Sequence, residues 1–319
     1  MSYEASIVIL SYNNYESTTG PCLESLFNDH ENGLFEIVVV DNASGDKTPE
    51  MLKMYSAQKS NLKPVLNSIN RGFAGGNNDG VKNIESDIVI LLNSDTIVPA
   101  GSIGKIVSHF KDNPEWGMLG PVTNAAGNEQ KIFISADDPE NGIIEGERFC
   151  SHSENDCFRT ERIDFFCAAM RRDVYENLGG LDEQFGLGYY EDLDFSVRAY
   201  RAGIKMMIAE DCFIYHSAGK TFSKVGKKNV RKLMHENKKK LKKKFSGNVK
   251  LFRLRDRNIK MMKEYINLKS MSDRSRSSDL DYKFNNRLLL AGEIYPHSPI
   301  KKMIYGYMIK RLGAAYREA

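Results

Sequence analysis

Three groups of polar side chains in this sequence have the types and spacing needed for group-transfer chemistry. Asn93-Ser94-Asp95 ends a short apolar run, Glu191-Asp192 follows two tyrosines, and His216 comes just after another apolar stretch. A carboxylate beside a second carboxylate can act as a general base, because its neighbour's charge makes it more basic. Asp95 and a neutral imidazole are both suitable ligands for a divalent cation. Each group also has an ordinary structural explanation: a turn, a helix start and a lone structural histidine.

The residues before these groups predict the elements that position them. Residues 88–92 are apolar on both faces, which is typical of a buried strand in a parallel sheet. Two earlier runs, 6–14 and 36–46, share this design of an apolar strand that ends in small polar residues. Helices are predicted through 22–27 and from Thr48, where proline follows a capping residue. This alternation predicts an α/β fold, with a doubly wound, mostly parallel sheet and helices on both faces.

Such a sheet collects ligands outside the carboxyl ends of its strands, where the polar residues stand. A glycine cluster at 72–76 precedes the 88–92 strand and leaves the backbone free to approach a phosphate or a ribose. The cluster is neither GxGxxG nor GxxxxGK[ST], which argues against a dinucleotide-binding protein or an ATPase. A flexible turn before a helix N-terminus is the alternative interpretation. The flanking side chains that offer contacts are Asn70, Arg71, Asn77 and Asn78.

Residues 123–160 are polar, rich in Asn, Asp, Glu and Ser, and have no clear period. This pattern predicts a long irregular region of the kind that forms lids or recognises substrate. An insertion without function is the alternative. A short helix is predicted next over 173–178, ended by Gly179-Gly180. Glu191, Asp192 and Asp194 precede another helix, which carries Phe195, Val197, Ala199 and Tyr200.

Composition places the chain among soluble globular proteins, with 319 residues, 41% apolar and 27% charged. No apolar run approaches the roughly 20 residues that cross a bilayer. The N-terminus has no basic region and enters a strand almost at once, so we expect no signal peptide. Five cysteines at irregular spacing favour reduced thiols, and Cys150, His152 and Cys157 lack the paired spacing of a zinc site. We therefore expect a cytoplasmic protein.

Charge is distributed unevenly along the chain. Residues 220–269 carry 19 Lys/Arg and 3 Asp/Glu, whereas residues 1–219 carry 17 and 34. The basic stretch 224–269 is predicted to be helical. It is either a solvated face or a peripheral contact with an anionic membrane; nucleic acid is not expected, since no recognised module accompanies the charge. The last segment, 287–316, has apolar patches that could pack on the body, on a partner subunit or on a membrane interface.

Several segments, taken in order, resemble the family 2 glycosyltransferases. The resemblance covers residues 5–219 and implies the GT-A fold. It divides the chain into a glycosyltransferase domain, 1–219, with a nucleotide-sugar half (1–100) and an acceptor and catalytic half (101–219). A basic helical extension, 220–319, follows. The matching segments are SIVILSYNN, EIVVVDNASGD, NRGFAGGNN, ILLNSDT, FFCAAMRRDVYENLGGLDEQFG and YYEDLDFSVRAYRAG.

The resemblance implies a nucleotide-sugar donor lying across the carboxyl edge of the sheet. Asp41 matches the acidic residue that hydrogen-bonds a pyrimidine base, which favours a UDP- or dTDP-linked sugar. The stretch from Asn70 to Gly76 matches the segment under the ribose and pyrophosphate. The donor-binding positions implied in this way are Ser11, Tyr12, Asn13, Asp41, Asn42, Asn70, Arg71, Gly72, Gly75, Gly76, Asn77, Asn93 and Ser94.

The same resemblance assigns the cation and the base. Asn93-Ser94-Asp95 takes the place of the DxD metal motif, with asparagine replacing the first carboxylate as in rhamnosyltransferase-like branches. Asp95 and His216 would hold Mg²⁺ or Mn²⁺. Asp192 matches the catalytic base, and Glu191 is its acceptor-side partner. One base without a second nucleophilic carboxylate implies a single displacement with inversion at the anomeric carbon.

The expected protein is an inverting glycosyltransferase of bacterial surface polysaccharide or other glycoconjugate synthesis. Its acceptor would be a glycan, a lipid-linked sugar or a protein, and its place the cytoplasm or the inner face of the membrane; oligomerisation is left open. Asn93 favours one alternative, a catalytically silent carbohydrate-binding or scaffold protein with the same fold. The other is a sugar nucleotidyltransferase. It would need a glycine-rich, basic loop after the first strand, and residues 11–17 contain neither glycine nor a basic residue.

Overall fold

The computed structural model describes residues 3–153, 155–217, 226–249, 253–271 and 276–319. Within them an eight-stranded sheet has the order β3-β2-β1-β4-β8-β6-β9-β7. Neighbours from β3 to β4 are parallel, β9 is parallel to β6, and only β8 and β7 run against the others. The strands are β1 (Ala5–Ser11), β2 (Phe35–Asp41), β3 (Leu62–Leu66), β4 (Ile88–Asn93), β6 (Trp116–Val122), β7 (Cys157–Thr160), β8 (Cys167–Arg171) and β9 (Lys205–Phe213).

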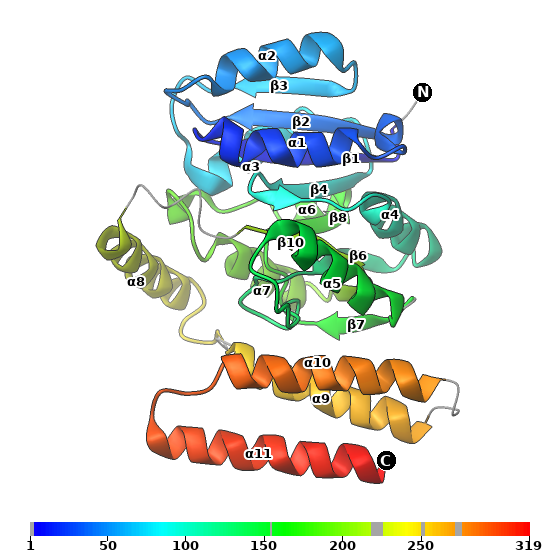
Figure 1. The fold of residues 1–319 in the computed structure, drawn as a ribbon. Helices are drawn as coiled ribbons and strands as arrows, with labels where there is room; N and C mark the ends of the chain where they lie inside the picture. The colour runs from blue at the N-terminus through cyan, green and yellow to red at the C-terminus, as the bar shows by residue number, and fades with distance from the viewer. Residues whose placement is uncertain (1–2, 154, 218–225, 250–252, 272–275) are drawn as a thin grey trace.

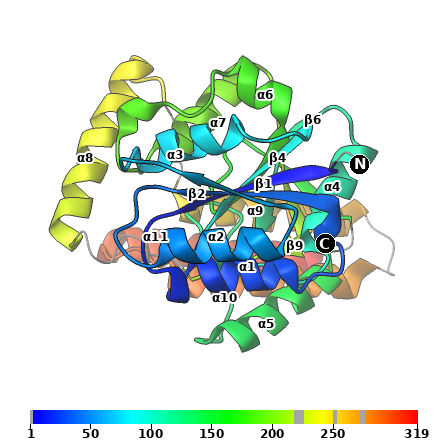
Figure 2. The ribbon, with the colours of Figure 1, turned by 90° about the horizontal axis from the view of Figure 1, so that it is seen from above.

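Helices cover both faces of this sheet, as Figure 2 shows from above. Alternate residues of each strand face opposite sides, so Ile90 of β4 joins one apolar core and Leu91 joins the other. The prediction of a mostly parallel, doubly wound sheet is confirmed. The helices that contribute to the first core are α1 (Thr19–Phe27), α2 (Thr48–Gln58) and α4 (Ser102–Asp112). Those of the second are α3 (Gly72–Val81), α6 (Arg172–Asn177) and α7 (Glu191–Arg201).

The glycine cluster is the start of helix α3 rather than an open loop. Gly72 has φ +69 at the turn, whereas Gly76 and Gly80 lie inside the helix. A Cβ on Gly76 would come 2.2 Å from Leu10 Cδ1, and one on Gly80 would come 2.3 Å from Val8 Cγ1. The glycines therefore allow the helix to pack closely on β1. The alternative interpretation, a turn followed by a helix N-terminus, is the one that the structure matches.

The prediction of an irregular region over residues 123–160 was wrong. It contains helix α5 (Pro139–Ser151) and strand β7. Asp138 caps the helix by accepting a hydrogen bond from Asn141 N at 3.0 Å. A Cβ on Gly146 would come 2.4 Å from the ring of Phe213, so α5 packs directly on β9. This packing decides the conformation, and the polar composition concealed it.

The C-terminal hundred residues are mainly helical where the structure describes them, as predicted. Figure 1 shows α8 on the side toward which β2 and β3 run, and α9 to α11 grouped at the end of the molecule opposite α2. Parts of the predicted basic stretch and linker, residues 224–225, 250–252 and 272–275, lie outside the described residues. Among the described helices, none combines the length and apolar character needed to cross a membrane. The helices are α8 (Lys227–Lys244), α9 (Leu254–Met271), α10 (Ser277–Glu293) and α11 (Pro299–Glu318).

Candidate active site

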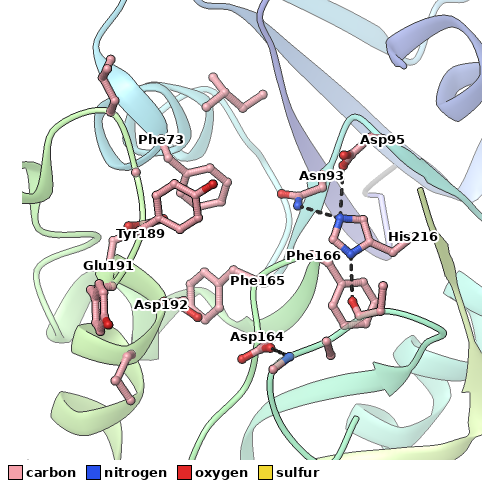
Figure 3. Close-up of a pocket in the computed structure, with 18 of the residues that line it drawn as sticks. Phe73, Asn93, Asp95, Asp164, Phe165, Phe166, Tyr189, Glu191, Asp192 and His216 are labelled. Atoms are coloured by element: carbon pink, nitrogen blue, oxygen red, sulfur yellow. Dashed lines mark hydrogen bonds and ion pairs between the residues drawn. The ribbon is translucent and has the colours of Figure 1, made fainter. Parts of the chain in front are cut away.

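A pocket of about 830 Å³ opens at the carboxyl edge of the sheet (Figure 3). This volume lies within the range of small-molecule and cofactor sites. Its wall is formed by the end of β4, the turn before α3, the segment before α7 and the end of β10 (Tyr215–His216). Residues that the sequence analysis singled out and that line it are Tyr12, Asn42, Asn70, Gly72, Asn93, Ser94, Asp95, Glu191, Asp192 and His216.

One side of the pocket joins His216 to the end of β4. The short strands β5 (Thr96–Ile97) and β10 (Tyr215–His216) pair antiparallel, with His216 opposite Thr96. This pairing places His216 Nε2 3.3 Å from Asp95 Oδ1 and 3.5 Å from the Asn93 amide nitrogen. The two candidate cation ligands, distant in sequence, therefore lie side by side.

The geometry of His216 suits a metal ligand. Its Nδ1 donates a hydrogen bond to the main-chain oxygen of Ala125 at 3.0 Å, and its ring stacks on Phe166. In the neutral ring, this bond leaves the Nε2 lone pair directed at Asp95. Burial lowers the pKa of His216, but the hydrogen bond and charge of Asp95 outweigh it, so the net shift is upward. A divalent cation bound by both side chains would take the place of that proton, and a carboxylate oxygen with an imidazole nitrogen fits such an ion.

A second cluster of metal-ligating side chains lies elsewhere. Atoms of His109, Cys157 and Asp211 come within 4.8 Å of one another. Cys157 Sγ is 3.8 Å from both ring nitrogens of His109, which places the sulfur over the ring rather than along either lone pair. Both carboxylate oxygens of Asp211 already contact Nε2, and none of the three residues lines the pocket. The arrangement is that of a buried histidine–aspartate hydrogen bond with a thiol neighbour.

The opposite side of the pocket is formed by the start of α7. Tyr189 and Tyr190, which precede the helix, have φ of 71 and 80 degrees. Residues other than glycine rarely adopt this left-handed backbone conformation, and each one that does lowers the stability of the fold by about 1–3 kcal/mol. Asn237 of α8 is fully buried and donates hydrogen bonds to the main-chain oxygens of Phe185 and Gly188, at 2.7 and 2.9 Å. Helix α8 thus holds the strained segment that presents the two carboxylates.

Asp192 is held by an arginine that the sequence analysis did not single out. Arg162 Nη2 lies 2.9 Å from Asp192 Oδ2 and 2.7 Å from Asp164 Oδ1. Asp164 in turn accepts a hydrogen bond from the main-chain nitrogen of Gly127. We call Arg162, Asp164 and Asp192 the pocket network. The guanidinium fixes the orientation of the Asp192 carboxylate.

Glu191 lies behind this network in an apolar setting. It is only 6% exposed, and its Oε2 has no hydrogen-bond partner within the described residues. Burial, followed by the charge of Asp192, raises the pKa of Glu191 to about 8. Glu191 is therefore neutral near pH 7. The two adjacent carboxylates have different surroundings, because Asp192 contacts Arg162 whereas Glu191 forms no ion pair in the described part of the chain.

One unsatisfied carboxylate, at the end of β2, lies outside the pocket lining, beside its donor side. Asp41 is 2% exposed, and its Oδ1 has no partner in the part of the chain that the structure describes. The next residue, Asn42, braces the turn before α3: its amide donates to Asn70 Oδ1 at 3.0 Å and to Gly72 O at 3.1 Å. An orphaned buried acceptor beside a braced turn suits a ligand that brings its own N–H donor.

Besides Asp41, six of the implied donor-binding residues do not line the pocket. Ser11 is buried and hydrogen-bonded to Thr19, and Asn13 accepts a hydrogen bond from Gly45 N. Arg71 forms ion pairs with Asp79 and Glu183, which link α3 to the segment before α7. The remaining three lie within helix α3: Gly75, Gly76 and Asn77. In this structure, all six stabilise the walls of the pocket from behind.

The sequence analysis also missed residues that do line the pocket. Arg162 and Asp164 stand directly before the apolar residues that lead into β8, the same design that drew attention to Asp95 after β4. Reading the polar residues before strands as well as after them would have found both. The aromatic lining gave no comparable signal: Phe73, Phe165, Phe166, Tyr189 and Tyr190.

Three comparisons place this geometry among known proteins. The sequence model described as "Glycosyl transferase family 2" matches residues 6–179, more than half of the chain. A poly(ribitol-phosphate) beta-glucosyltransferase of Bacillus spizizenii is 27% identical over 132 residues, which span 40% of this chain and 21% of that protein. The glycosyltransferase AglE of Haloferax volcanii is 24% identical over 71% of this chain and 70% of its own length. The chain thus matches only about a fifth of the length of some curated relatives.

Solved structures support the fold. A mannosyltransferase from Pyrobaculum calidifontis, in complex with GDP-Man and Mn²⁺, superposes with a TM-score of 0.53 at 15% identity, covering 99% of this chain and 86% of that one. A GalNAc-T7 structure with UDP, GalNAc and Mn²⁺ gives a TM-score of 0.54 at 15% identity, covering 66% and 43%. The GT-A fold expected from the sequence is confirmed.

Proposed function

Because the chain belongs to glycosyl transferase family 2, we propose that it transfers a sugar from a nucleotide-sugar donor to an acceptor hydroxyl by a single, inverting displacement. One observation carries the proposal. The pocket joins a candidate cation pair, Asp95 and His216, on one side to the carboxylate of Asp192 on the other (Figure 3). Attack and departure take place on opposite sides of the anomeric carbon in such a displacement.

Asp192 is the proposed base. A sugar hydroxyl is a poor nucleophile at neutral pH, so a carboxylate must accept its proton as attack proceeds. The contact with Arg162 orients Asp192 on the pocket wall. Neutral Glu191 beside it adds no further negative charge against the donor's phosphates. With Asp192 as the one proposed base and no carboxylate proposed as a nucleophile, the reaction would proceed with inversion.

Asp95 and His216 are the proposed cation ligands. A bound Mg²⁺ or Mn²⁺ would neutralise the charge that develops on the departing nucleoside diphosphate. Asn93, which replaces the first carboxylate of the usual motif, lies 3.5 Å from His216 and can hydrogen-bond the donor's ribose instead. The relatives solved with Mn²⁺ and a nucleotide or nucleotide-sugar support this assignment.

The donor is proposed to be UDP- or dTDP-linked, with its base at Asp41. The unpartnered Oδ1 of that side chain can accept the N–H of a pyrimidine ring. The acceptor is a glycan, a lipid-linked sugar or a protein. Relatives named as a poly-beta-1,6-N-acetyl-D-glucosamine synthase and a poly(ribitol-phosphate) beta-glucosyltransferase favour a polymer. The remaining pocket residues named above are proposed to contact the donor or to hold the walls that do.

A catalytically silent carbohydrate-binding protein is the second candidate, favoured by Asn93. A screen of nucleotide-sugars by thermal shift, with Mn²⁺ and with EDTA, separates the two, because a bound donor stabilises the fold by mass action. The proposal expects stabilisation by a UDP- or dTDP-sugar that EDTA abolishes, together with slow donor hydrolysis. His216→Ala should remove the metal dependence. A chain that neither binds nor hydrolyses any nucleotide-sugar with metal present is not a glycosyltransferase.

A further inference from the structure

Helix α11 has two apolar faces, and only one of them is packed. Tyr305, Leu312 and Tyr316 face the body, where they join the cores formed with α9 and α10. The opposite face is formed by side chains between 51% and 69% exposed. We call this set the outer face of α11: Ile300, Met303, Ile304 and Tyr307.

The spacing of the outer face makes it a continuous surface. Ile300, Met303 and Tyr307 are separated by three and four residues, and Ile304 is next to Met303. The four side chains therefore lie on one side of the helix over two turns. A helix that is apolar on opposite sides is ordinarily buried, and contiguous exposed apolar patches mark sites of interaction. The outer face therefore needs a covering that the chain itself does not supply within the described residues.

Positive charge borders this face. Lys301, Lys302, Lys310 and Arg311 are exposed along the same helix. The only acidic residue of α11 is Glu318, in its last turn. A second copy of this chain, related by a twofold axis, would set these cations against their own equivalents. Charge complementarity favours an anionic partner instead.

A shallow groove of about 240 Å³ adjoins the outer face. Its cations are Arg253 and Arg255, from the start of α9, and Lys301; Asp256 is the one acid at its edge. None of these three cations forms an ion pair within the described residues. The apolar side chains between them are Ile259, Ile304, Tyr305 and Met308. Cations above an apolar floor suit a phosphate that carries an acyl chain.

We propose that the outer face of α11 and this groove dock the protein on an anionic lipid membrane surface. Apolar side chains enter the headgroup boundary while the bordering cations meet lipid phosphates. This surface lies mainly outside the stretch 224–269 for which the charge pattern suggested a membrane contact. It shares with that stretch only the start of α9.

The proposed docking surface lies close to the pocket. Leu254, between Arg253 and Arg255, lines the catalytic pocket, so one turn of α9 borders both sites. In Figure 1, α11 starts on the side of the molecule where α8 stands, toward which β2 and β3 run. A docked protein would therefore hold its pocket close to a lipid-carried acceptor. That last step rests on the proposed function, whereas docking itself does not.

Sedimentation with vesicles tests the docking. The full chain is mixed with vesicles of phosphatidylcholine alone and of phosphatidylcholine with phosphatidylglycerol. We expect binding to the anionic vesicles that falls as salt is raised. Ile300→Gln/Met303→Gln/Tyr307→Gln retains helix-forming residues and should lower the partition coefficient at least about tenfold. Leu34→Gln/Met54→Gln is the control, because both side chains are apolar, are 46% and 47% exposed and belong neither to the outer face nor to the groove. Met54 belongs to α2, at the opposite end of the molecule from α11 (Figure 1).

Three outcomes would overturn the proposal. The first is equal binding to both vesicle types, and the second is equal loss in the control variant. The third is a concentration-dependent dimer, measured by light scattering without lipid, that the α11 variant converts to a monomer, since that would make the outer face a contact between copies. Donor hydrolysis without vesicles should be unchanged in the α11 variant, which keeps failure of docking distinct from failure of the proposed function. Melting temperatures of all variants confirm that each is folded.

Discussion

Two of the networks in which described residues bring cations and carboxylates together below the surface differ in what surrounds them. In the pocket network, Arg162 contacts Asp164 and Asp192. In the second, which we call the sealed network, Glu210 of β9 contacts Lys283 Nζ at 2.7 Å and Arg287 Nη2 at 2.9 Å. Both cations of the sealed network come from α10.

Exposure separates the two networks. Side chains of the sealed network are 0% exposed, whereas those of Arg162 and Asp192 are 20% and 19% exposed, on the wall of a pocket. A fully buried pair contributes little net stability, but removing one partner leaves an uncompensated charge. An ion pair on a pocket wall can instead exchange its partner for a ligand. The same chemistry therefore serves attachment of the C-terminal helices in one place and proposed catalysis in the other.

The largest expected effect is on activity. Asp192→Asn should lower transfer by about 10³-fold, because the variant has no carboxylate to accept the acceptor's proton. Its melting temperature should barely change, since asparagine still accepts a hydrogen bond from Arg162. Steady-state transfer and thermal melting are measured together. Asp182→Asn is the control, because Asp182 pairs with Lys244 and does not line the pocket.

Near-normal turnover of Asp192→Asn would show that another group is the base. A large loss of stability in the same variant would show that the pocket network resembles the sealed one. Either result would remove the contrast between the two networks.

Glu210→Gln should instead lower the stability of the protein and leave its activity unchanged. One carboxylate then no longer faces two buried cations, which should cost about 3–5 kcal/mol of the free energy of unfolding. That corresponds to a fall in melting temperature of about 10 °C for a chain of this size. The turnover number of the folded fraction should stay close to normal. Denaturant unfolding and an activity assay below the transition measure the two effects.

Glu236→Gln is the matched control for this variant. Glu236 forms an exposed pair with Lys232 at 4.0 Å, and losing it should cost less than about 1 kcal/mol. Equal, small losses in both variants would mean that the sealed network does not hold α10 to the sheet.

The smallest expected effect concerns Glu191 and pH. Burial, then the charge of Asp192, raises the pKa of Glu191 to about 8 in the folded protein, so the folded state holds its proton while the unfolded chain releases it. Wild-type stability should therefore fall as pH rises from the unfolded pKa toward 8. Glu191→Gln cannot ionise and should gain at least about 1 kcal/mol relative to wild type by neutral pH. Melting curves across this range measure the difference, and one independent of pH would contradict the raised pKa.

The sheet and half of the pocket could be predicted because local patterns encode them. The apolar run 88–92, bounded by polar residues, specifies a buried strand and places Asp95 at its carboxyl end. The Glu191-Asp192 pair marks a helix start in the same local way. Contacts far apart in sequence left no such trace. The role of Arg162 depends on its contact with Asp192, 30 residues later in the sequence. Helix α5 forms where it packs on β9.

The basic extension shows the limit of composition most clearly. From charge alone, 224–269 was one surface for one of several partners. The structure divides the C-terminal cations among three environments: α8 beside the pocket, the sealed network of α10, and the border of the outer face of α11. A lysine has the same side chain in each. Burial and neighbours, which a sequence does not specify, determine what it does.

The sequence by itself determined the α/β fold and the edge of the sheet where the candidate site lies, because these follow from short-range periodicity and from side chains at strand ends. It determined the family through the segments that match it. Tertiary structure alone decided that His216 meets Asp95, that an arginine holds Asp192, and that one face of α11 stays uncovered. The physical reason is one of range. Hydrophobic periodicity acts within a helix or strand, whereas the state of a charge depends on every group that folding brings within a few ångströms.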